Sequence, residues 1–407
     1  MKKTLLALML AAALPAHAQM DIQPEDGASL LIWTDRGAHT EFMEYAAGEF
    51  SREFNVPVTV NAVPPMDTIK RLIQDGGSAK VGDVVEFEHD LLGAALAAGV
   101  LMENLVSSDR IEAEFTQGAI NAAKDAQGVM YGFPVMFNTK IMYYNKDLLP
   151  EGVATVEDMI TFSQDFSNAE ENKYGMLWDI QNFYDSRMFV SLFGGYEFGN
   201  NGTNPQDIGL ASDFAVKGVQ AMLELKPYVD ANSADVRNPQ VRRGLFAEGK
   251  VAALVDGPWA LAGLQNSGVN LGMQAMPSFK GQELRTFQTV RLAGVSSFTE
   301  YPRAAQLFAD FITTDEMAMK RHEMTNAVPP VRNVMNELSK SDNEFIRAMV
   351  MQGAQADAMP GIAEMGYVWQ PMQAALSQIW DNGGDVKASL ESAHNVIAQQ
   401  IQMQSSK

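Results

Sequence analysis

The sequence predicts an α/β protein of two lobes, each a mostly parallel sheet flanked by helices. Short apolar runs with β character alternate with amphipathic helical segments along most of the chain. Strands that alternate with helices are typical of a parallel sheet covered on both faces. The 407 residues suffice for two lobes, and no low-complexity linker separates them. We therefore expect lobes joined by several crossings of the chain rather than lobes connected in series.

The first third of the chain shows this alternation in order. Leu30–Trp33 is a short apolar run that predicts a strand. In the next segment, phenylalanine or alanine recurs every fourth residue, at Phe42, Ala46, Phe50 and Phe54, which predicts an amphipathic helix over 40–54. The elements expected after it are a strand over 56–60, a helix over 67–75 and a strand over 83–87.

Residues 132–150 are the most informative stretch of the sequence. The run begins with GFPV at 132–135 and ends with YYNKDLLP at 143–150. Its mostly apolar character predicts a β segment that ends in a turn. The pairing of the two motifs resembles the crossing between lobes in bacterial extracytoplasmic sugar-binding proteins, so we expect this segment to pass from one lobe into the other.

The second half repeats the pattern, with Thr155 as an expected helix N-cap. Two further crossings of the chain are expected, one extended over 287–295 and one in the loop 327–330. The remaining expected elements are helices over 155–166, 187–193 (stopped by Gly194 and Gly195), 213–225 and 302–312, a buried strand over 251–255, and a C-terminal amphipathic helix marked by Val386, Leu390, Ala393, Ile397 and Ile401.

The N-terminus predicts export from the cytoplasm. Lys2 and Lys3 precede an apolar run over 4–14, and small residues follow at Ala16 and Ala18, so we expect a signal peptide over 1–18. The run is shorter than the ~20 residues that span a bilayer. With no cysteine for a lipoprotein signal, the mature protein is expected to be soluble in the periplasm.

The composition narrows the classes of ligand. There are 50 acidic and 30 basic residues, a net charge of −20, which disfavours nucleic acid and anionic lipid. A hydrophobic content of 46% supports a folded core, and the absence of cysteine excludes disulfides and thiol chemistry.

Seven motifs occur in an order that resembles one family of exported proteins. They are LLIWTDRG (30–37), GDVVEFEHDLLGAALAAGVL (82–101), GFPVMFNTKIMYYNKDLLP (132–150), LFGGYEF (192–198), LFAEGKVAALVDGPWAL (245–261), MPSFKGQ (276–282) and GYVWQPMQAAL (366–376). Together they resemble the maltose/maltodextrin-binding family of periplasmic solute-binding proteins. The resemblance implies the two-lobed periplasmic binding protein fold, a sugar held between the lobes, and delivery of that sugar to the permease of an inner-membrane ABC transporter. It also implies a monomer without a cofactor. The expected division is 19–136 and 294–338 for the N-terminal lobe, and 137–293 and 339–407 for the C-terminal lobe.

Aromatic and planar polar side chains are what a sugar site needs. Aromatic planes cover the apolar faces of sugar rings, and carboxylates, amides and guanidinium groups pair with hydroxyls. Asp35, Arg36 and Glu88 follow expected strands, where α/β proteins bind ligands. By resemblance, the other site residues are Phe87, Asp90, Asn138, Asn182, Tyr184, Trp259 and Trp369. Trp178 and Trp380 are assigned to the core, and Trp33 to packing behind the site.

The sequence departs from the maltose-binding pattern at charged positions. Asn138 and Asn182 stand where that pattern has glutamates, and Leu91 stands where it has an arginine. Near Trp369, Gln370 and Gln373 replace a tyrosine and an arginine of that pattern. Amides still pair with hydroxyls, so a different oligosaccharide is an open alternative. Arg291 either restores a positive charge at the site or links the lobes.

Other classes of function were weighed against this one. A glycoside hydrolase needs two carboxyl groups flanking the scissile bond, and no convincing pair is apparent. The five histidines show no metal-ligand spacing, and no nucleophile elbow or phosphate loop is present. We therefore expect a binding protein rather than an enzyme. A same-fold binder of a polyamine or a metal stays open, although a polyamine site would favour carboxylates over tryptophans.

Overall fold

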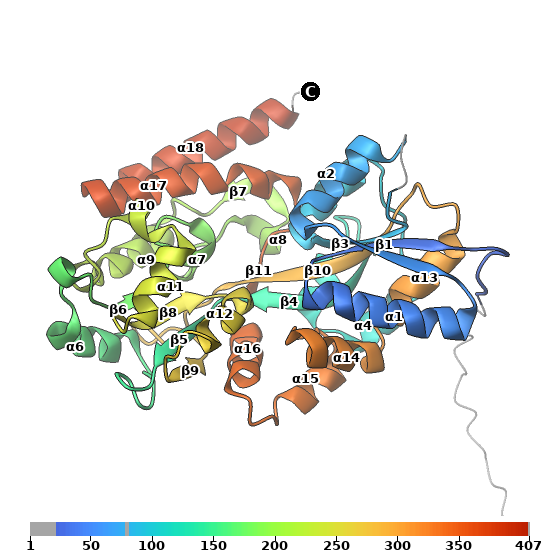
Figure 1. Ribbon diagram of the computed structural model, residues 1–407. Coiled ribbons are helices and arrows are strands. Elements are labelled where there is room, and N and C mark those ends of the chain that lie inside the picture. The colour runs from blue at the N-terminus through green and yellow to red at the C-terminus, as the bar shows by residue number, and fades with distance from the viewer. Residues whose placement is uncertain (1–21, 78–80, 406–407) are drawn as a thin grey trace, which may run out of the picture.

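The chain forms two lobes built around separate sheets, as the computed structural model shows for residues 22–77 and 81–405 (Figure 1). The first sheet has six strands and the second has four. The predicted two-lobed α/β fold is confirmed. The predicted signal peptide, residues 1–18, lies outside the described residues.

The first sheet is mixed: its N-terminal strands pair in parallel, and the later strand β10 pairs antiparallel with two of its neighbours. Strand β1 pairs in parallel with β2 and β3, as expected from the alternation with helices. Strand β10 runs antiparallel to both β3 and β4, because it enters this sheet from the second lobe. The strands are β1 (Leu30–Thr34), β2 (Val58–Ala62), β3 (Val84–Glu88), β4 (Gly132–Thr139), β10 (Phe287–Val295) and β11 (Asp357–Ala358).

Helices cover this sheet with the apolar faces that the sequence predicts. In α1 the side chains of Phe42, Ala46 and Phe50 are buried, and the Phe50 ring meets Phe308 of α13 with centroids 5.1 Å apart. The helices of this lobe are α1 (Ala38–Phe54), α2 (Pro65–Asp75), α3 (Leu92–Ala97), α4 (Ser108–Glu114), α5 (Gln117–Ala122), α13 (Pro302–Phe311) and α14 (Asp315–Thr325).

The second sheet has the order β6-β8-β5-β9. Three of its strands run in one direction, and β5, which arrives from the first lobe, runs antiparallel to β8 and β9. Trp178 and Trp380 pack in this lobe as the sequence predicts, fully buried with ring centroids 5.6 Å apart. The strands are β5 (Ile141–Asn145), β6 (Tyr174–Leu177), β8 (Val251–Asp256) and β9 (Leu271–Gln274).

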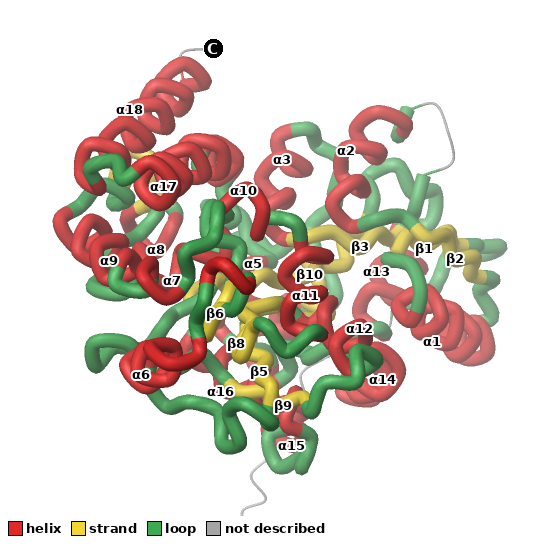
Figure 2. The backbone as a smooth tube through the Cα atoms, turned by 60° about the vertical axis from the view of Figure 1, so that its left-hand side comes forward, coloured by secondary structure: helices red, strands yellow, loops and turns green. Residues whose placement is uncertain are grey.

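Figure 2 shows the helices that surround the second sheet and the connection between the lobes. Thr155 caps α6 through a capping box with Asp158, as predicted. The remaining helices of the described chain are α6 (Val156–Phe166), α7 (Phe183–Val190), α8 (Gly199–Gly202), α9 (Asp213–Leu223), α10 (Ser233–Val236), α11 (Pro239–Ala247), α12 (Leu261–Gln265), α15 (Arg332–Leu338), α16 (Glu344–Gln355), α17 (Trp369–Asn382) and α18 (Val386–Ser405). The short strand β7 (Asn204–Ile208) lies apart from both sheets. None of the helices in the described part of the chain is long and apolar enough to cross a membrane.

The first predicted crossing is confirmed and is very short. Strand β4 ends at Thr139 in the first sheet and β5 begins at Ile141 in the second, so Lys140 alone separates them. The Thr139 hydroxyl donates to the carbonyl of Phe287 at 2.9 Å, which ties this crossing to the start of β10. The loop 327–330, where the third crossing is expected, is hydrogen-bonded to β4. The Phe137 amide donates to the carbonyl of Val328 at 3.0 Å.

Several local expectations need correction. Strand β2 begins after Pro57 rather than at Val56. Helix α7 starts at Phe183, because the Asn182 side chain caps it, and it ends at Val190, before Gly194. The crossing expected over 287–295 does not lie within this segment, because all of β10 pairs within the first sheet. A strand's apolar pattern does not reveal which sheet it joins. The lobe boundaries themselves stay a prediction.

Candidate functional site

A cavity of about 280 Å³ lies where the two lobes meet. The loop after β1 contributes Asp35, and α1 contributes His39. Strands β4 and β10 contribute Asn138 and Arg291, and the loop after β8 contributes Trp259. Three predicted site residues, Asp35, Asn138 and Trp259, therefore line one cavity.

Arg291 organises the polar side of this cavity. Its guanidinium lies 2.8 Å from the carboxylate of Glu88 and 3.3 Å from that of Asp35. Glu88 is directly opposite Arg291 in the antiparallel register of β3 and β10. The pairing brings two carboxylates, one at the end of β3 and one just after β1, to a single guanidinium in the middle of β10, which leaves a net negative charge.

A second, fully buried ion pair lies behind the first. Arg321 contacts Glu86 at 2.7 Å, and neither side chain is exposed to solvent. The Thr34 hydroxyl donates to the other Glu86 oxygen at 2.7 Å. Burial and the charge of Arg291 lower the pKa of the nearby His39 to about 4. His39 is therefore neutral at ordinary pH, and its Nδ1 is buried without a hydrogen-bond partner in the described structure.

Two carboxylate oxygens at the site lack donors. Glu88 Oε2 and Asp90 Oδ1 are buried, and neither accepts a hydrogen bond from any described residue. Burial raises the pKa of Asp90, and the charge of Glu88 adds to this effect while His89 opposes it. Buried polar atoms are ordinarily satisfied, so each of these oxygens can still accept a hydrogen bond.

Two aromatic rings share one buried ammonium group on the other side. Trp259 is 54% exposed, although it follows the buried strand β8. The Nζ of Lys140 lies 4.9 Å from the centre of the Trp259 ring and 5.7 Å from that of Tyr184. An exposed indole beside a cleft offers a flat apolar surface to a ligand.

Trp369 is linked to Tyr184 through a small aromatic cluster. Its ring centroid lies 6.2 Å from that of Phe183 and 6.3 Å from that of Phe287. Tyr184 also contacts Phe287, at 5.8 Å. Phe287 is fully buried at the start of β10, so the returning strand brings Tyr184 and Trp369 together.

Three predicted site residues have other surroundings. Phe87 is fully buried in the core, where a Cβ placed on Gly294 would lie 2.9 Å from its ring, and this corrects its expected contact with ligand. Alternate residues of a strand face opposite sides, so Glu88 points toward the cleft while Phe87 packs inward. Arg36 is exposed and does not line the cavity. The Asn182 side chain accepts the amide hydrogen of Tyr184 at 3.0 Å as a helix cap.

The sequence analysis missed His39, Lys140 and Phe287. A histidine in the first turn of an amphipathic helix and a phenylalanine in an apolar strand carry no special signal. Lys140 does carry one, because it is a single cation within the otherwise uncharged run 132–145.

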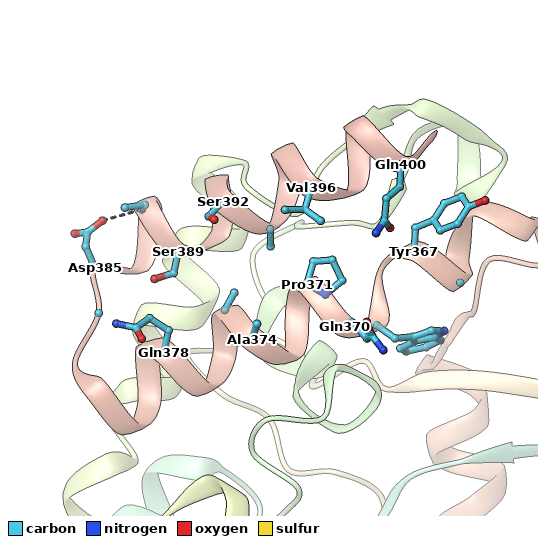
Figure 3. A pocket seen from close by; sticks show the side chains of 16 residues that line it. Tyr367, Gln370, Pro371, Ala374, Gln378, Asp385, Ser389, Ser392, Val396 and Gln400 are labelled. Atoms are coloured by element: carbon cyan, nitrogen blue, oxygen red, sulfur yellow. Dashed lines mark hydrogen bonds between the residues drawn. The ribbon is translucent and has the colours of Figure 1, made fainter. Parts of the chain in front are cut away.

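A larger hollow, about 1190 Å³, lies elsewhere, along α17 and α18 (Figure 3). Gln370, Pro371 and Ala374 come from one helix, and Ser392 and Val396 come from the other. Among the predicted site residues only Trp369 lines it. Since the smaller cavity joins residues of both lobes and is lined by Asp35 and by Arg291, the partner of Glu88, we place the candidate site there.

Comparison with known proteins agrees with this architecture. Residues 45–348 match the family of bacterial extracellular solute-binding proteins. The chain belongs to this family. The solute-binding protein is 30% identical over 405 residues to the galactooligosaccharide-binding protein of Bacillus subtilis, covering 97% of this chain and 94% of that relative. It is 26% identical to a maltooligosaccharide ABC transporter solute-binding lipoprotein of Streptococcus pneumoniae, with 98% and 95% covered.

Solved structures also resemble the solute-binding protein over nearly their whole length. A cyclo/maltodextrin-binding protein complexed with maltotetraose has a TM-score of 0.85 and 28% identity, covering 92% of this chain and 97% of that one. A maltose-binding periplasmic protein of Listeria monocytogenes in complex with maltose has a TM-score of 0.83 and 26% identity, with 93% and 99% covered. The predicted family is thereby confirmed.

Proposed function

We propose that this solute-binding protein captures a neutral oligosaccharide between its lobes and passes it to the membrane subunits of an ABC transporter. The observation that carries the proposal is a cavity lined both by an exposed indole, Trp259, and by Asp35 and Arg291. Glu88, the partner of Arg291, keeps one buried oxygen without a donor among the described residues. Sugars match this chemistry, since their ring faces are apolar and their hydroxyls donate to carboxylates. The maltodextrin and galactooligosaccharide ligands named for the relatives and structural neighbours support the same class.

The ligand-binding set we propose comprises Asp35, Glu88, Asp90, Asn138, Tyr184, Trp259 and Trp369, with Arg291 holding the carboxylates in place. Asn138 is 7% exposed in β4, opposite Thr289 of β10, and its amide faces a cavity whose charges are supplied by Asp35 and Arg291. Amides replace the glutamates of the maltose-binding pattern at Asn138 and Asn182, which leaves an oligosaccharide other than maltose open. The binding experiment therefore includes a galacto-oligosaccharide as well as α-glucans.

Calorimetric titration of the purified protein tests the proposal. The panel consists of maltose, maltotriose, maltotetraose, a galactotriose and, as a competing class, spermidine. At least one oligosaccharide should bind with one-to-one stoichiometry and raise the melting temperature, since a ligand that binds only the folded state stabilises it. Binding of spermidine without binding of any sugar would overturn the proposal and assign the carboxylates to a polyamine.

We propose the periplasm as the location of the mature protein, on the strength of the charged, apolar and small-residue segments within residues 1–18. We also propose a monomer, as the family resemblance implies. Mass spectrometry of protein released from the periplasm should give a chain that begins at Gln19. Recovery of intact Met1 in the membrane fraction would contradict this location.

A further inference from the structure

Lys140 occupies the shortest connection between the lobes. It is the one residue between β4 and β5, and it is only 5% exposed. An ammonium group taken out of water is costly unless charges and hydrogen bonds compensate for its burial. A neutral residue would join the two strands equally well, so the buried charge needs a reason of its own.

Two buried aspartates compensate Lys140, and each belongs to a segment that carries an aromatic ring. The Nζ lies 2.9 Å from Asp185, whose neighbour in α7 is Tyr184. It lies 3.7 Å from Asp256, the last residue of β8, three positions before Trp259. Both aspartate side chains are 1% exposed.

Asp256 also accepts hydrogen bonds from two groups other than Lys140. Arg243 donates to its Oδ2 at 2.9 Å, and the Gly257 amide donates to its Oδ1 at 2.8 Å. Burial alone would raise the pKa of Asp256, but Lys140 and Arg243 hold it below its ordinary value. The carboxylate is therefore charged, and it anchors the loop that presents Trp259.

The ammonium group also contacts the rings themselves. Its distances of 4.9 Å to the Trp259 centroid and 5.7 Å to the Tyr184 centroid are within the range of a cation–π interaction, which is strongest where the cation is desolvated. One buried charge thus contacts both rings and pairs with the aspartate beside each of them. No other lysine or arginine with a cation–π contact in the described structure contacts two rings.

We propose that Lys140 is a positioning residue: it holds Trp259 and Tyr184 in the arrangement that stacks on the sugar, and it links that arrangement to the strand that crosses between the lobes. The inference rests on the proposed function for its sugar ligand. Lys140 itself acts through the two rings and their aspartates.

Lys140→Met removes the charge and keeps the length of the side chain. With the tightest-binding sugar of the panel, it should raise Kd about tenfold, the scale expected when a desolvated cation–π contact and its ring geometry are lost. Lys140→Arg should recover part of that loss. Arg242→Met is the matched control, because Arg242 is a 4% exposed cation of the same lobe that pairs with Asp179 and contacts no ring. Its Kd should stay within about twofold of the parent value.

A double-mutant cycle separates positioning from general stability. If Lys140 acts through Trp259, Lys140→Met should add little to the loss already caused by Trp259→Ala. Fully additive losses, or an unchanged Kd in Lys140→Met, would overturn the proposal. If Lys140→Met does not fold, Lys140→Met with Asp185→Asn removes the carboxylate left without its partner, and the same cycle is run in that background.

A measurement without ligand keeps this test separate from the proposed function. The contribution of Trp259 to the near-ultraviolet circular dichroism is the difference between the parent protein and Trp259→Phe. That contribution should collapse in Lys140→Met and persist in Arg242→Met. If no sugar of the panel binds, the proposed function fails, while this spectrum still decides whether Lys140 fixes the ring. A persistent Trp259 signal in Lys140→Met would defeat the positioning role.

Discussion

The guanidinium of Arg291 lies 2.8 Å from the carboxylate of Glu88, its direct partner across the antiparallel pair of β10 and β3. The same guanidinium reaches Asp35 after β1. The sequence left two roles open for Arg291, a positive charge at the site or a link between the lobes. Arg291 lines the cavity, and its partners Glu88 and Asp35 belong to β3 and to the loop after β1 of the same sheet, so its ion pairs do not link the two sheets. It thereby fixes the carboxylates that we propose as ligand contacts.

Arg291→Met should lower the free energy of unfolding by about 3 kcal/mol, because it leaves Glu88 and Asp35 without a counter-charge in a largely buried place. Arg291→Met with Glu88→Gln should recover part of the loss. Urea denaturation measures both, and Arg303→Met is the control, since Arg303 is 58% exposed in its pair with Glu25 and should cost less than ~1 kcal/mol. Equal losses for the two arginine variants would show that the Arg291 pair is an ordinary surface pair.

Trp259→Ala should weaken sugar binding by about 1–3 kcal/mol, roughly tenfold to a hundredfold in Kd, because it removes a stacking face. The melting temperature without ligand should change little, since the side chain is 54% exposed. Phe214→Ala, also exposed at 59% but on α9, is the control for loss of an exposed ring. A large drop in melting temperature with unchanged affinity would make Trp259 a packing residue.

His39→Gln should make the protein less sensitive to acid. The pKa of His39 falls from 6.5 to about 4 on folding, so between these values the unfolded chain binds the proton and the folded chain does not. The contribution of His39 to the free energy of unfolding of the parent protein therefore becomes less favourable as the pH falls from about 6.5 to 4. At pH 4 the loss from this residue should be on the order of 2 kcal/mol, allowing for partial exposure.

Thermal melts of both proteins between pH 4 and 8 measure the effect of His39. The difference between them should be constant above pH 7 and should shift in favour of His39→Gln as the pH falls. Parallel curves over the whole range would mean that His39 titrates alike in the folded and unfolded chain.

Asn138→Glu should shift the ratio of affinities toward maltose relative to the tightest-binding sugar of the panel. Asn138 lines the cavity beside Arg291, and the maltose-binding pattern has a glutamate at this position. Titration of both proteins with both sugars gives the ratio. Thr289→Val, at the facing position of β10, changes the same pair of strands without adding a charge and serves as the control. An unchanged ratio would leave specificity to other positions, such as Leu91 or Asn182.

Local pattern was a good guide to the elements of this chain. The spacing of Phe42, Ala46 and Phe50 predicted α1, and the apolar runs predicted β1, β3 and β8, because side-chain periodicity reflects burial of one face. The loops after β1 and β8 were expected at the site, and Asp35 and Trp259 do line its cavity. Phe87 was misplaced, since a resemblance between sequences does not tell which side of a strand a ring faces.

By itself, the sequence determined the alternating α/β elements, the first crossing near 132–150, the aromatic and acidic loops, and the family resemblance that names a sugar as ligand. Only the tertiary structure decided that β10 belongs wholly to the first sheet and that Arg291 pairs with Glu88. It also decided that the Lys140 ammonium group contacts the rings of Trp259 and Tyr184. The physical reason is the range of the interactions. Periodicity depends on neighbours a few positions apart, whereas the Arg291–Glu88 contact joins residues 203 positions apart, which become partners only when β3 and β10 pair in the first sheet.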